Sequence, residues 1–191
     1  MKSIMFFILI LILFSCNQNQ RDGSNENSLD TVTLSEDIYT SKKFKYSIQI
    51  PKGWEIKDET YTINIDLKLI DGNGNSIIIK VEPLSEKVDE SAYEIFSIYS
   101  NREIEQMLGA NTPNPKIVKR GKINIDNVEW VYFHFTSKAS NENTTLMHKQ
   151  YSAFYNMKLY SITMTCFTNQ ENANLSAFDL ITKSFKFSSL K

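Results

Sequence analysis

The chain has 191 residues, of which 41% are hydrophobic and 23% charged, and its formal net charge is -1. This composition is typical of a globular protein and excludes wholesale disorder. The near-zero net charge removes the general attraction to phosphate that basic domains carry, so we expect no nucleic-acid partner. Two cysteines are too few for a disulfide framework or a cysteine-rich zinc site.

The N-terminal segment places a short apolar run behind a positive charge. Lys2 is followed by eleven apolar residues, from Ile4 to Phe14. As a helix this run covers about 16 Å, too little for a hydrocarbon core of about 30 Å. It has the size of the apolar region of a signal peptide. The sequence Leu13-Phe14-Ser15-Cys16 that follows resembles the lipobox of bacterial lipoproteins, which are cleaved before the cysteine and acylated on it.

This resemblance implies that residues 1–15 are a lipoprotein signal peptide and that Cys16 carries the lipid. Two acyl chains hold a protein stably on a membrane. Residues 16–40 are rich in Asn, Gln, Ser, Asp and Glu and bury too little apolar surface to order themselves, so they form a flexible tether. We therefore expect a lipoprotein of the bacterial cell envelope, facing the periplasm, with its folded domain at residues 41–191. An ordinary signal peptide followed by chance by cysteine is the alternative.

The folded part begins with alternating strands and continues with a helix. The first strands are predicted at residues 44–50, 61–69 and 77–81, with a turn at 71–75. Residues 89–108 read as one helix, with Asp89 as its cap and Gly109 after its end. Four more strands are predicted at 116–125, 128–137, 144–154 and 159–167, then a helix at 171–184 and a short strand at 185–187. Strands in runs with helices between them predict an α+β fold, an antiparallel sheet of six to seven strands covered by two main helices.

The opening strand and turn carry a family resemblance. Tyr46-Ser47-Ile48-Gln49-Ile50-Pro51-Lys52-Gly53-Trp54 resembles the aromatic-x-hydrophobic-x-hydrophobic-Pro-x-x-Trp opening of PsbP-like domains. The similarity extends over residues 40–190, through the later hairpins to the closing helix. It implies a PsbP-like sandwich and a protein that acts by binding partners. The family brings no shared catalytic residues, so none is assigned here.

The chain contains few residues arranged for catalysis or metal binding. Gly72 and Gly74 open a strand and not a helix, so they form a turn and not a phosphate loop. The two histidines, His134 and His148, lie on consecutive predicted strands and would share a face if Ser137 pairs near residue 145. Two histidines without a third ligand seldom hold a metal, so we expect no metal site and no cofactor. Cys166 alternates with hydroxyl residues and is expected to be a buried free thiol.

The sequence therefore predicts a non-enzymatic, membrane-anchored lipoprotein whose domain binds an unknown protein or envelope component. The candidate binding residues are aromatic or imidazole side chains on the predicted strands and the first turn: Trp54, Trp130, Tyr132, His134 and His148. The alternative is a small-ligand or metal-binding carrier, or an enzyme, that uses an aromatic groove near His134 and His148.

Overall fold

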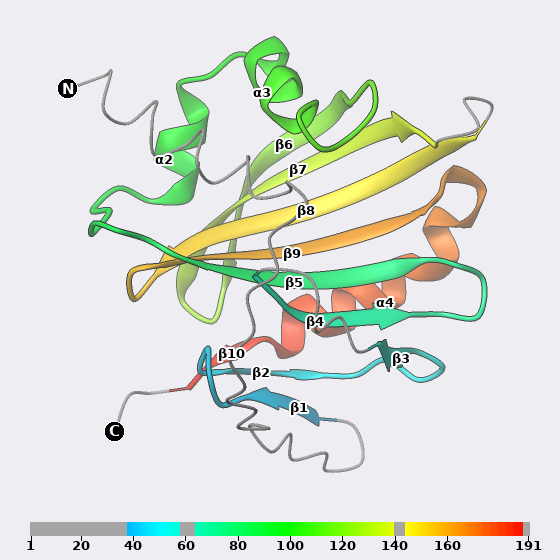
Figure 1. Ribbon diagram of the computed structural model, residues 1–191, viewed down its shortest axis with the longest axis horizontal. Coiled ribbons are helices and arrows are strands. Elements are labelled where there is room, and N and C mark those ends of the chain that lie inside the picture. Colours follow the sequence, from blue (N-terminus) through cyan, green and yellow to red (C-terminus); the bar gives the residue numbers. More distant parts are fainter. Residues whose placement is uncertain (1–37, 58–63, 140–143, 189–191) are drawn as a thin grey trace, which may run out of the picture.

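The computed structural model describes residues 38–57, 64–139 and 144–188. The expected signal peptide, Cys16 and most of the tether lie outside these residues. The described chain is an α+β fold with a seven-stranded antiparallel sheet, ordered β3-β4-β5-β9-β8-β7-β6, and a smaller sheet, ordered β1-β2-β10 (Figure 1). This confirms the predicted fold class, with the second sheet as an addition.

The elements of the first half are β1 (Ile38–Ser41), β2 (Tyr46–Gln49), β3 (Glu55–Lys57), β4 (Ile65–Ile70), β5 (Ser76–Pro83), α2 (Ala92–Ser97) and α3 (Asn101–Leu108). The second half contains β6 (Lys116–Ile125), β7 (Val128–Lys138), β8 (Thr145–Tyr155), β9 (Lys158–Phe167), a 3-10 turn (Thr168–Gln170), α4 (Glu171–Ser184) and β10 (Lys186–Phe187).

Two tight turns set the register of the long strands. Asp126 and Asn127 have φ values of 50° and 61°, and Asn156 and Met157 have 46° and 56°. Two successive residues with positive φ make a two-residue hairpin turn whose twist matches that of the strands. Strands β6, β7, β8 and β9 pair consecutively and antiparallel, which confirms the predicted antiparallel sheet.

The single helix predicted at residues 89–108 is wrong, because the segment forms two helices. Ser91 caps α2 and Ser100 caps α3, and each serine makes a capping box with the glutamate three residues later. At Ser100 the backbone is extended, with φ -68° and ψ 161°, so the first helix cannot continue through it. Asp89 is not the cap, since the first helix begins after Ser91.

Paired structure also begins earlier than the predicted boundary at residue 41. Strand β1 starts at Ile38 and pairs along its whole length with β2. The strand predicted at 61–69 starts at Ile65 within the described residues, and 61–63 lie outside them.

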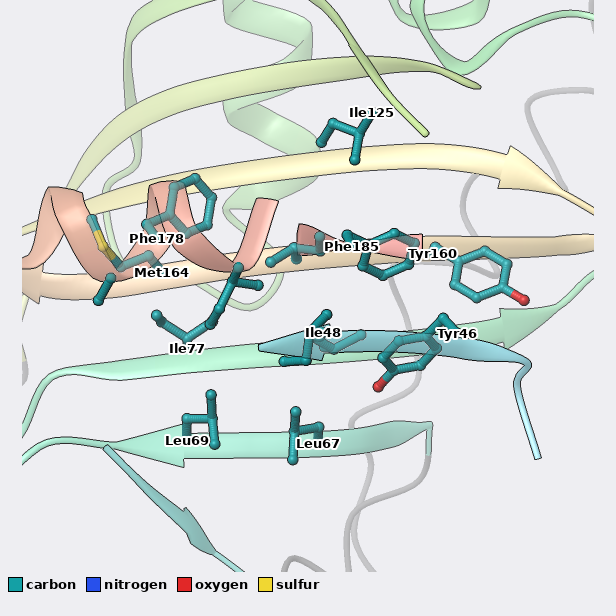
Figure 2. Close-up of a cluster of buried hydrophobic side chains, with 14 of the residues drawn as sticks. Tyr46, Ile48, Leu67, Leu69, Ile77, Ile125, Tyr160, Met164, Phe178 and Phe185 are labelled. Atoms are coloured by element: carbon teal, nitrogen blue, oxygen red, sulfur yellow. The ribbon is translucent and has the colours of Figure 1, made fainter. Parts of the chain in front are cut away.

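The core lies mainly on one face of the large sheet, which we call the α4 face because α4 and the smaller sheet cover it. Its fully buried side chains include Tyr46, Ile48, Leu69, Ile77, Tyr160, Met164, Phe178 and Phe185 (Figure 2). The ring of Tyr46 stacks on that of Phe185 with 5.1 Å between centroids. A smaller cluster, containing Ala92, Ile104, Val131, Phe133 and Phe135, lies on the opposite face, which we call the α2 face. Strand β7 is thus packed on both sides.

Candidate functional site

Of the two tryptophans predicted to line a binding surface, one lies in the core and the other packs against it. The side chain of Trp130 is 0% exposed, and its indole N–H donates to the carbonyl oxygen of Ile125 at 3.3 Å. Trp54 is half-buried against the same core cluster. The sequence could not place Trp130, because residues 130–135 are apolar or aromatic on both sides of the strand. The expectation that Trp130 lies at a binding surface is wrong.

The two histidines point to opposite faces of the sheet. Ser137 pairs with Leu146 and not with residue 144 or 145, so His134 lies opposite Lys149 and His148 lies opposite Phe135. Neighbouring residues of a strand point to opposite sides, which separates the two imidazoles. The face-sharing histidine pair considered from the sequence is therefore not formed. Among the described residues there is no group of three or more His, Cys, Asp or Glu side chains that could hold a metal ion.

His148 lies on the α2 face in a buried chain of hydrogen bonds. Its Nε2 is 2.7 Å from Oγ of Ser137, and its Nδ1 is 2.9 Å from Oγ1 of Thr165. The imidazole also stacks on the ring of Phe135 at 4.6 Å. Burial lowers the pKa of His148 to about 4, so the ring is neutral near pH 7. These contacts join β7, β8 and β9 and give His148 a structural role.

His134 lies on the α4 face within a half-exposed aromatic group. Its ring centroid is 5.0 Å from that of Tyr132 and 6.2 Å from that of Tyr151, and it is nearly parallel to the latter. All three side chains are half-buried and come from β7 and β8. We call these three residues the Tyr132–His134–Tyr151 cluster. It is the part of the predicted aromatic groove that the structure brings together.

One lysine gives this cluster a positive border, and a second lysine beside it is ion-paired. The ammonium of Lys119 lies 5.8 Å from the ring centroid of Tyr132, and that of Lys149 is 3.1 Å from a carboxylate oxygen of Glu171. Desolvation, followed by the charges of Lys149 and Lys119, lowers the pKa of His134 to about 4. The buried Nε2 of His134 has no hydrogen-bond partner among the described residues. The cluster therefore presents a neutral imidazole, aromatic surface and the cation of Lys119, a combination suited to acidic or polar partner groups.

A glycine that the sequence did not single out shapes the cluster. A Cβ atom added to Gly121 of β6 would lie 2.8 Å from the hydroxyl oxygen of Tyr132. The Tyr132 ring therefore lies directly over the backbone of the neighbouring strand. Only the pairing of Gly121 with Tyr132 reveals this role, since the glycine has no motif around it.

Comparison with known proteins places this architecture in a family. A family model described as PsbP-like protein matches residues 3–187, and the chain belongs to that family. No similar sequence was found among curated proteins.

Three solved structures are similar in fold. The cyanobacterial PsbP of Synechocystis sp. PCC 6803 has a TM-score of 0.56 at 15% identity, with 86% of this chain and 98% of that chain covered. LpqN, described as involved in cell envelope biogenesis of Mycobacterium tuberculosis, has a TM-score of 0.52 at 6% identity, covering 75% and 83%. A point mutant of the protein Mog1 has a TM-score of 0.50 at 9% identity, covering 76% and 92%. At these identities the similarity shows the fold alone.

None of the helices in the described ranges is long and apolar enough to cross a membrane.

Proposed function

We propose that the protein is a lipoprotein of the bacterial cell envelope whose PsbP-like domain acts by binding a protein or another envelope component. The observation that carries this proposal is the Tyr132–His134–Tyr151 cluster, a half-exposed aromatic surface bordered by Lys119. Tyrosine is enriched at protein interfaces because it combines large apolar area with a polar tip. The lipobox-like sequence ending at Cys16 supports the location, as does the role in cell envelope biogenesis described for the structurally similar LpqN.

The cluster is suited to recognition and poorly suited to proton transfer. A general base works best when its pKa lies near the operating pH. The pKa of His134 is lowered to about 4, so its conjugate acid is scarce and its basicity weak at neutral pH. The neutral ring instead adds to the aromatic surface that Tyr132 and Tyr151 offer to a partner. We therefore propose that this cluster serves binding and not catalysis.

Site-specific photo-crosslinking in living cells tests this proposal on the full-length protein. A photoreactive amino acid replaces Tyr132 on the α4 face, and a matched control replaces half-buried Thr163 of β9 on the α2 face. We expect a discrete adduct from position 132 that weakens with Lys119→Glu and is absent from position 163. Equal labelling at both positions, or none at either, would contradict binding through this surface.

Labelled palmitate tests the anchor independently. We expect the label in the wild-type protein and its loss in Cys16→Ala, since Cys16 is one of only two cysteines and Cys166 is buried. A Cys166→Ala variant, which keeps the proposed acylation site, should retain the label. Labelling that persists in Cys16→Ala would refute the lipoprotein assignment.

The small-ligand alternative keeps one supporting observation, the Nε2 of His134, which has no hydrogen-bond partner among the described residues. A carrier would use this nitrogen to bind a small polar ligand beside the rings of Tyr132 and Tyr151, whose centroids are 5.9 Å apart. Protein-observed NMR with a panel of small phenols and anions would distinguish this function, because a carrier would show saturable shifts at His134 without any protein partner.

A further inference from the structure

The edge of the large sheet next to the cluster is a long basic strand. Strand β6 pairs with β7 on one side and is the last strand in the sheet order. Its sequence, Lys116–Ile125, contains four basic residues and no acidic one. Two of its apolar side chains are exposed to solvent, Val118 at 63% and Ile123 at 38%. An edge strand presents unpaired backbone N–H and C=O groups, to which another extended chain can pair.

The register shows which backbone groups of β6 face outward. The two-residue turn at Asp126 and Asn127 makes Ile125 and Val128 a hydrogen-bonded pair. Residues with inward-facing and outward-facing backbone groups then alternate, and the only register shift lies between Ile117 and Lys119. The outward groups of the regular part are therefore those of Arg120, Lys122 and Asn124. Among the described residues, no backbone hydrogen bond joins them to another element.

One outward N–H of β6 already binds a carboxylate. The backbone N–H of Ile117 donates to Oε1 of Glu105 at 2.9 Å, and the ammonium of Lys116 donates to Oε2 at 3.0 Å. One carboxylate of α3 thus joins an outward backbone donor to the neighbouring cation. The bulge at Val118 ends the portion of the strand that Glu105 covers. Beyond the bulge, outward backbone N–H groups again lie next to basic side chains, but no carboxylate of α3 binds them.

The cations of the open portion lie on both faces of the sheet. Lys119 lies on the α4 face over Tyr132, whereas the guanidinium of Arg120 donates to the carbonyl oxygen of Tyr99 on the α2 face. Neither forms an ion pair with a carboxylate in the described part of the chain. Lys122 is paired with Glu129 at 2.8 Å. A second copy of β6 would place like charges against each other, which is destabilising, so an acidic strand is the better complement.

We propose that β6 binds an extended, acidic segment of a partner protein, which adds to the seven-stranded sheet alongside residues 119–125. The segment's backbone pairs with Arg120, Lys122 and Asn124, and its carboxylates lie near Lys119 and Arg120. The apolar side chains of the partner segment cover Ile123. This inference rests on the proposed binding function and names the chemistry of the partner. The edge adjoins the Tyr132–His134–Tyr151 cluster through Lys119, so both surfaces belong to one interface.

The test titrates the full-length protein in detergent with a synthetic peptide of alternating glutamate and valine, followed by fluorescence anisotropy and hydrogen exchange. We expect saturable binding, weakened by salt, with new amide protection at residues 119–125. Asn124→Pro removes an outward N–H, and Lys119→Glu reverses a charge without changing the backbone; each should weaken binding about tenfold or more. The matched control, Lys57→Glu, lies on the opposite edge strand, β3, and should bind like the wild type.

Each other outcome overturns the inference in a recognisable way. Binding that Asn124→Pro leaves unchanged would show an electrostatic contact without strand addition. Self-association with protection at 119–125 would identify a second copy as the occupant, and stronger binding to anionic vesicles than to the peptide would identify a lipid surface. Cross-linking at position 132 without peptide protection at 119–125 would refute this inference while leaving the proposed function intact.

Discussion

Protonation of His148 is expected to destabilise the fold as the pH falls. The imidazole is 8% exposed and is held between Ser137 and Thr165 as a neutral ring. Burial lowers its pKa from 6.5 to about 4. The unfolded chain therefore takes up this proton near pH 6.5, whereas the folded chain takes it up only near pH 4. The contribution of His148 to the free energy of unfolding is therefore fully present above pH 6.5, falls as the pH drops through this window and stops changing below pH 4.

The magnitude follows from the width of the window. Each pH unit between the two pKa values changes the free energy of unfolding by about 1.4 kcal/mol. Between pH 7.5 and pH 4.5 the contribution of His148 amounts to about 2.5 kcal/mol. This is a substantial part of the roughly 5–15 kcal/mol that stabilises a typical domain.

Urea unfolding of the wild type and His148→Gln at several pH values measures this contribution. The measured quantity is the free energy of unfolding of the wild type minus that of His148→Gln, in which carboxylates that titrate in both proteins cancel. This difference should decrease by about 2.5 kcal/mol between pH 7.5 and pH 4.5. Ser137→Ala is the matched control, because it breaks the hydrogen bond at 2.7 Å but keeps the titrating ring, and it should retain the wild-type slope. A difference that does not change with pH would show that His148 titrates alike in both states and would refute the reasoning.

Three further predictions test the core, the cluster and the free thiol. Trp130→Ala should lower the free energy of unfolding by about 3–5 kcal/mol in urea titrations, and a loss under about 1 kcal/mol would contradict its burial. Gly121→Ala should displace the Tyr132 ring, shift its NMR signals and cost about 1–3 kcal/mol, whereas Gly72→Ala, with open space around it, should leave those signals in place. Cys166 is buried, with its pKa raised to about 11 by desolvation, so peptide mapping should find it unmodified by a thiol reagent at pH 8 until urea unfolds the chain.

The candidate site shows why some of its residues can be predicted from the sequence and others cannot. Tyr132 and His134 are two residues apart on one strand, so the sequence alone indicates a shared face. Tyr151 and Gly121 join them only through pairing with neighbouring strands, and a shift of one residue would replace both. The two histidines demonstrate this sensitivity, because the observed register sends them to opposite faces.

Local chemistry in the sequence was sufficient for the antiparallel α+β fold and for the two-residue turn at Asp126 and Asn127. Alternation and turn residues act over a few positions, so the type of each strand and turn can be recognised from neighbouring residues. The division of residues 89–108 into two helices was also encoded locally, in the serine-glutamate capping pairs that begin at Ser91 and Ser100. The spacing of the apolar residues nevertheless favoured a single helix.

Only the tertiary structure decided which apolar side chains form the core and which remain exposed. Trp130 and Tyr132 alternate with equally apolar neighbours on a strand covered on both faces, so burial depended on where α4 and the smaller sheet lie. The structure likewise decided that basic β6 is an edge strand, because strand order results from long-range pairing and packing. Such contacts join residues far apart in the chain, and no local pattern of charge or hydrophobicity specifies them.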